Sequence, residues 1–329
     1  MLFTILAIGI GLISEGLETN PLYYALLTER INTRERIDRA AFLKEYTEAR
    51  YGVLDADLIR AHELLLESVY APVRLQEGCQ ESILCARPSL TANKASTWSK
   101  PQDYYDKAKV REAAKLLLKA GKAHRLNKHR TYRHDMADLC RQVLADQARL
   151  QLPKVKAAFD AKDKDAFDKE SAAYLQLIRD TATVLSTSED FLLGRFLKGA
   201  ESKGGENAAA RAEMRQAMLQ LITTWTPTGG MLNDYAHRQL SELMSQYYLK
   251  RWEAFFNAKK AELRGQALAG EGGRSAAQTT ENNGEAVSTS YELSKSVDAV
   301  EQNFRKSKLR LRTKRAGKIN KVATRILAK

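Results

Sequence analysis

The residue best placed to do chemistry in this sequence of 329 residues is Glu15, within the segment Gly9-Ile10-Gly11-Leu12-Ile13-Ser14-Glu15-Gly16. It follows a run from Met1 to Ile8 that is apolar except for Thr4, which is typical of a buried parallel strand. Barrel and open-sheet enzymes carry catalytic groups just past the carboxyl ends of such strands. On spacing alone, a strand followed by a turn and a surface glutamate is the plainer interpretation.

A second candidate site is the stretch from Thr224 to Ala236. It places Trp225 ahead of a turn rich in Pro and Gly, and Asp234 and Tyr235 after it. A flat aromatic face with polar groups beside it suits a sugar ring and its hydroxyls. The same residues would equally serve as a turn and a helix cap that only pack, so the segment by itself leaves both interpretations open.

Other chemical patterns are weak. His124, His129 and His134 recur every five residues, which puts them on different faces of a helix, and the sequence predicts neither a metal nor a cofactor. There is no zinc-ligand spacing, phosphate-binding glycine loop or catalytic-triad pattern. Cys79 and Cys85 would close a small loop in an oxidising compartment, but three cysteines in total leave the pairing and the compartment open.

The charge of the chain is concentrated at its end. The net charge is +13, and the segment 303–329 holds eleven Lys and Arg residues and no Asp or Glu, so the remainder carries 13 − 11 = +2. Such a tail would bind an acidic polymer through counterion release. The favoured interpretation is a packed helix face, because apolar residues alternate with the basic ones: Leu309, Leu311, Ile319, Val322, Ile326 and Leu327.

The elements that would position these residues are mostly helices. Helical periodicity predicts helices from about Pro21, from Asp38 to Tyr51 and from Asp55, and then nearly continuous helix from about residue 105. The last long helix is predicted from about 232 to 263. Residues 71–104 read as a long loop, 264–296 as a flexible linker rich in Gly, Ser and Asn, and 297–329 as a basic helix and tail. The N-terminal apolar run is too short to span a membrane as a helix.

Taken in order, several segments resemble the C-terminal part of the α-N-acetylglucosaminidases, glycoside hydrolase family eighty-nine. The segments that carry the resemblance are Gly9-x-Gly11-x-x-x-Glu15-Gly16 with Asn20, Arg50-Tyr51-Gly52-Val53, Glu81 to Leu90, Tyr132-Arg133-x-Asp135-x-x-Asp138-Leu139-x-Arg141-Gln142, Phe191 to Gly194, Trp225-x-Pro227 with Asp234-Tyr235-Ala236, Tyr247-Tyr248-x-x-Arg251-Trp252, and Glu301-Gln302-x-Phe304-x-x-Ser307-Lys308.

The resemblance implies a mainly α fold, a multi-helix C-terminal domain preceded by a single remnant strand of a TIM-like barrel. Residues 1–21 would end the barrel and 22–263 would form the helical domain. The implied activity is the retaining hydrolysis of terminal α-linked N-acetylglucosamine from glycans, with Glu15 as nucleophile. Trp225 and Tyr235 would contribute to the sugar pocket, with Asp234 and Met231 beside them.

Two departures from the family pattern limit these expectations. Thr226 stands where the family usually has Gly, and the loop between Trp225 and Tyr235 is one residue longer. No residue of this sequence can be assigned as the general acid/base, which would lie in the rest of the barrel. The resemblance therefore predicts a C-terminal portion that is inactive alone, with a separate chain supplying the barrel as one possible partner. Members of the family are commonly exported or lysosomal, and no signal peptide is visible here.

The alternative hypothesis is a non-enzymatic helical module that binds glycan or nucleic acid through its basic tail. Nucleic acid is the less favoured partner, and no membrane association is expected.

Overall fold

The computed structural model describes residues 11, 21–33, 35–71, 82–96, 101, 104–226, 232, 234–265, 284–307 and 309–329, with side chains from Lys295 onward in the last long helix. The expected strand at 1–8, Glu15 and Met231 lie outside the described residues. In the part that is described, every regular element is a helix. The predicted mainly α fold is therefore confirmed. No helix there is both long and apolar enough to cross a membrane.

The elements in chain order are α1 (Pro21–Asn32), α2 (Arg39–Tyr51), α3 (Ala56–Leu66), the 3-10 turn η1 (Ile83–Cys85), α4 (Lys107–Ala123), η2 (Leu126–Lys128), α5 (Arg130–Asp160), α6 (Lys164–Leu185), η3 (Glu189–Phe191), α7 (Leu193–Ser202), α8 (Ala208–Leu221), α9 (Ser241–Leu243), the π-helical turn η4 (Met244–Tyr248), α10 (Leu249–Leu263), α11 (Gly284–Lys306) and α12 (Ile319–Leu327).

Local sequence signals set several helix ends as predicted. The side chains of Asp38 and Asp55 accept hydrogen bonds from backbone amides in the first turns of α2 and α3. Gly52 ends α2 in the left-handed conformation, with φ of 73°, which glycine adopts without steric cost. Pro153 lies within α5 and does not end it.

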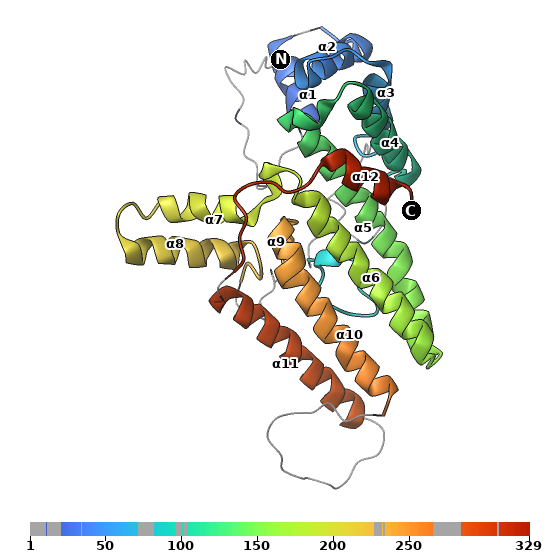
Figure 1. The fold of residues 1–329 in the computed structure, drawn as a ribbon, viewed down its shortest axis with the longest axis vertical. Coiled ribbons are helices and arrows are strands. Elements are labelled where there is room, and N and C mark those ends of the chain that lie inside the picture. The colour runs from blue at the N-terminus through green and yellow to red at the C-terminus, as the bar shows by residue number, and fades with distance from the viewer. Residues whose placement is uncertain are drawn as a thin grey trace, which may run out of the picture.

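The antiparallel pair α5 and α6 forms the centre of the fold, and other elements pack around it (Figure 1). At one end, α4 packs on α5 and α3 packs on α4, and the C-terminal helix α12 lies across α4, α5 and α6. At the other end, α10 packs on α6, and α11 runs beside α10. The hairpin of α7 and α8 projects from this body (Figure 1).

The core is rich in aromatic residues, which agrees with the aromatic stripe predicted for the helix at about 232–263, now η4 and α10. The rings of Tyr174 on α6 and Trp252 on α10 pack at a tilt of 54°, with centroids 4.6 Å apart, and Phe167 meets Phe256 edge to face at 6.1 Å. The Trp252 indole also donates to the Leu84 carbonyl at 3.2 Å. Aromatic pairs of this geometry add to the free energy gained by burial.

Two predicted elements differ from the structure. The helix predicted from 232 begins only at Ser241, because Asp234 and His237 have φ of 61° and 32°, outside helical values. Helix α11 begins at Gly284, inside the range assigned to a linker, and its buried residues Val297 and Phe304 belong to the stretch that packs against α10 and η4.

The basic C-terminal segment is largely packed on the body. Ile319, Ile326 and Leu327 of α12 are buried, as the packing interpretation of this segment predicts. Asp180 on α6 is 2% exposed and binds the ammonium of Lys329 at 2.6 Å and the guanidinium of Arg325 at 3.1 Å. These contacts fix the end of the chain against the central helix pair.

Candidate functional site

The Trp225 loop, which we define as residues 225–235, brings two predicted site residues into contact. The rings of Trp225 and Tyr235 lie 5.1 Å apart, centroid to centroid, at an interplanar angle of 64°. Both side chains are half-buried, so each keeps an exposed face. The edge-to-face pair thus offers partly open aromatic surface, as a sugar ring requires.

The base of the Trp225 loop is closed by backbone hydrogen bonds. The amide of Asp234 donates to the carbonyl of Thr224 at 3.2 Å, and the amide of Trp225 donates to the carbonyl of Gln220, at the end of α8, at 2.8 Å. Trp225 and Asp234 both have positive φ, 63° and 61°, which side chains other than glycine rarely adopt. Such backbone strain persists only where the surroundings hold it, and it recurs at ligand sites.

Asp234 is held by a buried ion pair rather than aimed at the solvent. Its carboxylate, 2% exposed, accepts two parallel hydrogen bonds from the guanidinium of Arg251, at 2.8 and 2.9 Å. Arg251 is fully buried on α10, and its guanidinium carbon lies 5.1 Å from the ring centroid of Tyr247. The two-pronged pair is the strongest geometry available to Arg and a carboxylate. Asp234 therefore anchors its end of the loop to α10.

The ion pair continues into α11. The Nε of Arg251 lies 3.4 Å from Glu301 Oε1, and Glu301, fully buried, also accepts from Arg87 at 3.0 Å. Arg87 in turn pairs with Asp298, one turn earlier on α11. Burial raises the pKa of the Glu301 carboxyl above its usual range, and Arg251 and Arg87 oppose that rise. Two arginines and three carboxylates thus connect η1, the Trp225 loop, α10 and α11.

Sequence reasoning missed the roles of Arg251, Arg87 and Glu301, although all three lie in segments that carry the resemblance. A signal was present for Arg251. It is a charged residue within an aromatic stripe that includes Tyr247, Tyr248 and Trp252, and a buried charge requires a partner. The partner, Asp234, lies 17 residues earlier in a loop, and no periodic pattern identifies it.

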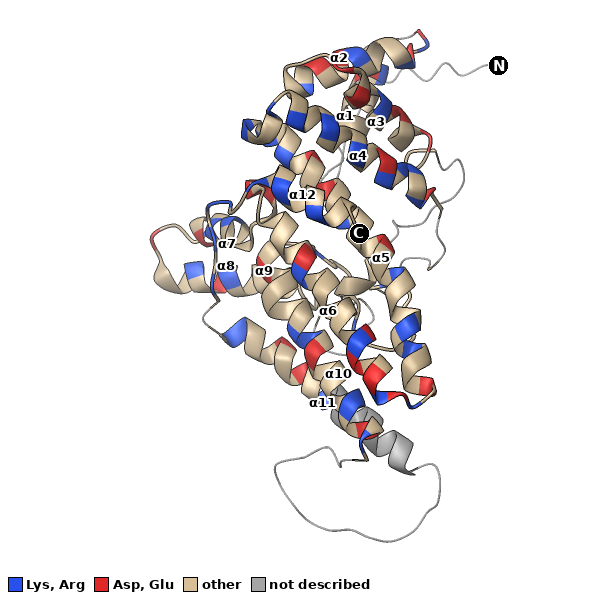
Figure 2. Ribbon diagram, turned by 45° about the vertical axis from the view of Figure 1, so that its right-hand side comes forward, with Lys and Arg blue, Asp and Glu red and all other residues tan. Residues whose placement is uncertain are grey.

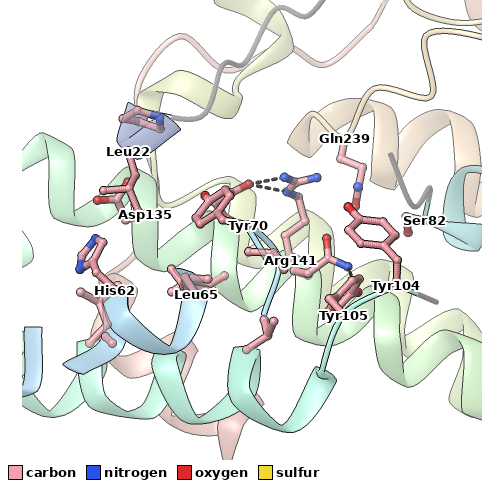
Figure 3. Close-up of a pocket in the computed structure, with 18 of the residues that line it drawn as sticks. Leu22, His62, Leu65, Tyr70, Ser82, Tyr104, Tyr105, Asp135, Arg141 and Gln239 are labelled. Atoms are coloured by element: carbon pink, nitrogen blue, oxygen red, sulfur yellow. Dashed lines mark hydrogen bonds and ion pairs between the residues drawn. The ribbon is translucent and has the colours of Figure 1, made fainter. Parts of the chain in front are cut away.

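A cavity of about 350 Å³ lies next to the Trp225 loop. Ala236 to Gln239, which directly follow Tyr235, form part of its wall, together with Pro21 and Leu22 at the start of α1. Figure 3 shows Leu22, His62 and Asp135 at one end of the cavity, Gln239, Ser82 and Tyr104 at the other, and Arg141 between them.

The charged groups of the cavity are paired. Asp135 accepts from Arg50 Nε at 2.5 Å and from the Tyr51 hydroxyl at 2.7 Å, and Asp138 accepts from Arg141 Nε at 2.9 Å. Burial lowers the pKa of His62, whose Nδ1 lies 2.8 Å from the Leu58 carbonyl, so its imidazole is neutral at pH 7. The carboxylates of Asp135 and Asp138 are thus both occupied by structural hydrogen bonds within the described part of the chain.

The other candidate residues have structural partners. His124 bonds to Asp55 at 2.7 Å and His134 lies 3.4 Å from Asp190, on different parts of the fold. Across the described ranges, no three His, Cys, Asp or Glu side chains form a group that could hold a metal. Cys85 is a free, buried thiol, and Cys79 lies outside the described residues.

Comparisons with known proteins identify the family of this chain. Residues 42–329 match the alpha-N-acetylglucosaminidase (NAGLU) C-terminal domain family. The human alpha-N-acetylglucosaminidase is 32% identical over 255 residues, which are 76% of this chain and 33% of the human protein.

Solved structures of a family 89 glycoside hydrolase from Clostridium perfringens are also similar. One, in complex with GlcNAc-alpha-1,4-galactose, superposes with a TM-score of 0.78 at 27% identity, covering 94% of this chain and 33% of that one. Another, in complex with PUGNAc, gives a TM-score of 0.77 with 93% and 33% coverage. The chain thus spans a third of the length of these relatives. Through its helical domain, the chain belongs to the α-N-acetylglucosaminidase family.

Proposed function

We propose that this chain forms the helical part of a retaining enzyme that removes terminal α-linked N-acetylglucosamine from glycans. Trp225 and Tyr235 contact the sugar, Asp234 shapes their loop, and Glu15 is the nucleophile. Family membership supports this activity, and so does the similar clostridial hydrolase, whose structure holds GlcNAc-alpha-1,4-galactose. Met231, in the same loop, remains a candidate contact.

The observation that best supports the proposal is the composition of the cavity wall. Pro21 and Leu22, which follow the expected end of the barrel, line the same cavity as Ala236 to Gln239, which follow Tyr235, with Leu22 and Gln239 at its opposite ends (Figure 3). Glu15 lies six positions before Pro21, and an extended chain of that length reaches about 20 Å at most. This allows Glu15 and the aromatic pair to serve one sugar-binding site.

The domain division follows the same proposal. Residues 1–21 end a TIM-like barrel, 22–263 form the helical domain, 264–296 connect to the last part of the chain, and 297–329 close the helical domain. The retaining mechanism needs a second carboxyl about 5 Å from the nucleophile. Asp135 and Asp138 are both bound to arginines of the helical domain, so we assign neither to that role. We therefore expect the general acid to come from polypeptide that supplies the rest of the barrel.

Hydrolysis of an aryl α-N-acetylglucosaminide tests the proposal. The purified chain should show no turnover, and adding a polypeptide that carries the rest of a family barrel should restore it. Glu15→Gln should abolish the restored activity, and Trp225→Ala should raise KM. Leu232→Ala, a change at an exposed residue of the same loop, is the matched control. Turnover by the chain alone that Glu15→Gln removes would contradict the need for a separate acid. No turnover in the complemented sample would contradict the proposed activity.

One observation favours the alternative of an acidic-polymer binding module. Arg310, Arg312 and Lys314 are exposed in the segment between α11 and α12. Figure 2 shows this segment largely in the colour of Lys and Arg. Its backbone is anchored, because the amides of Arg310 and Arg312 donate to the side chains of Gln246 and Glu242, both at 3.1 Å. Salt-dependent retention on heparin that is lost when these three residues become Ser would support this second function.

A further inference from the structure

Helix α11 contacts one end of the Trp225 loop directly and reaches the other end through Arg251 of α10. The guanidinium of Arg305 donates to the hydroxyl of Thr224 at 2.9 Å, immediately before Trp225. Glu301, one turn earlier on the same helix, lies against Arg251, which holds Asp234 at the other end of the loop. Residues four apart share one face of a helix, so a single face of α11 reaches both ends of the loop.

A third α11 residue packs between these two. The ring of Phe304, 4% exposed, lies 5.1 Å from the ring of Tyr247, and Tyr247 contacts Arg251. The apolar contact fixes the position of α11 relative to α10, and with it the two arginine contacts. Neither arginine extends beyond the loop base: Arg251 is fully buried, and the bond from Arg305 ends on Thr224, which is also fully buried.

From these contacts we infer that Arg251 and Arg305 are positioning residues for the Trp225–Tyr235 pair, and that α11 clamps the two ends of the loop, at Thr224 and Asp234. This inference rests on the proposed sugar site. Because Trp225 and Asp234 hold positive φ, the loop would relax to other conformations without partners at both ends. The clamp thus sets the angle between the two rings without touching the sugar.

The two contacts should tolerate different substitutions. Arg251 makes two parallel bonds to a carboxylate, which a lysine ammonium cannot reproduce. Arg305 makes one bond to a hydroxyl, so the matching change is Thr224→Val, which keeps the shape of the side chain and removes the acceptor. Thr224→Ser restores the acceptor. Lys306, an exposed neighbour on α11, provides the control for charge.

The test reads the loop directly by ¹⁹F NMR of the full chain labelled with 5-fluorotryptophan. The sequence has three tryptophans, and Trp225→Phe assigns the loop signal. Fully buried Trp252 reports the folded core. Thr224→Val and Arg305→Met should shift or broaden the Trp225 signal and leave the Trp252 signal in place. Thr224→Ser and Lys306→Met should change neither.

Affinity is measured in the same variants with the inhibitor 2-acetamido-1,2-dideoxynojirimycin, in the presence of the barrel-bearing polypeptide. Thr224→Val and Arg305→Met should weaken binding about 10-fold, the scale of a misplaced contact group. An unchanged Trp225 signal in both variants would overturn the clamp. A shifted signal with no inhibitor binding by the unsubstituted protein would instead refute the proposed sugar site and support the clamp.

Discussion

The hydroxyl of Tyr132 on α5 donates to the side-chain oxygen of Asn320 on the C-terminal helix α12, at 2.6 Å, and both residues are buried. The side-chain nitrogen Nδ2 of Asn320 donates in turn to the backbone carbonyl of Gly121 on α4, at 3.2 Å. The Tyr132 ring is therefore locked between three helices.

The fixed position of the Tyr132 ring predicts that Gly121→Ala lowers the free energy of unfolding. Glycine to alanine inside a helix normally stabilises a protein by about 1 kcal/mol. At Gly121 the added methyl would overlap the Tyr132 ring, which cannot move away without losing Asn320. Overpacking of this kind costs about 1–3 kcal/mol, so we expect a net loss of stability in urea unfolding. Gly199→Ala on α7 is the control, because an added methyl group there meets no neighbouring atom, and this change should stabilise the protein. A gain at both positions would show that Tyr132 is not locked.

Breaking the Asp234–Arg251 pair should be costly. Asp234→Leu leaves a fully buried guanidinium without its closest counter-ion, and losses of about 3–5 kcal/mol are typical of such changes. The double variant with Arg251→Met should recover much of that loss, since it removes the unpaired charge. The exposed pair of Lys250 and Glu253 is the comparison, and Lys250→Met there should cost less than about 1 kcal/mol. Equal losses in the two single variants would contradict the buried pairing.

Glu301 should make stability fall as pH rises. Burial raises its pKa above the ordinary 4.5, and one of its oxygens is buried without a hydrogen-bond partner in the described part of the chain. A carboxyl with a raised folded-state pKa favours folding when protonated. Its contribution is present below pH 4.5 and is lost as the pH rises through the raised value.

Glu301→Gln tests this, because the amide keeps an acceptor for Arg87 and removes the titrating proton. The groups that face Glu301 are Arg87, Arg251, Asp234 and Asp298, and all remain in the variant. Thermal unfolding from pH 4 to 8 should show a smaller fall in Tm for the variant than for the unsubstituted protein. Parallel curves would assign the pH dependence to other groups.

Two thiols should be unreactive in the folded protein. Burial raises the pKa of the Cys85 and Cys140 thiols, and both are fully buried, so little thiolate is available. In a Cys79→Ser variant, Ellman's reagent at pH 8 should find no fast-reacting thiol in the native chain and two in urea. Fast reaction of either thiol in the native chain would contradict its burial.

Local sequence determined much of the helical framework. Asp38, Asp55 and Gly52 set helix ends through bonds to residues a few positions away, and such signals are visible in any short window. The aromatic stripe that includes Tyr247 and Trp252 is buried as its spacing predicts.

Only the tertiary structure decided the candidate site. The helix predicted through Asp234 does not form, because Arg251, 17 residues away, holds that carboxylate in a loop with positive φ. Caps and stripes depend on neighbours along the chain, whereas a buried ion pair depends on which helices meet. Which helices meet depends on how the whole core is buried, so a short stretch of sequence cannot predict the ion pair.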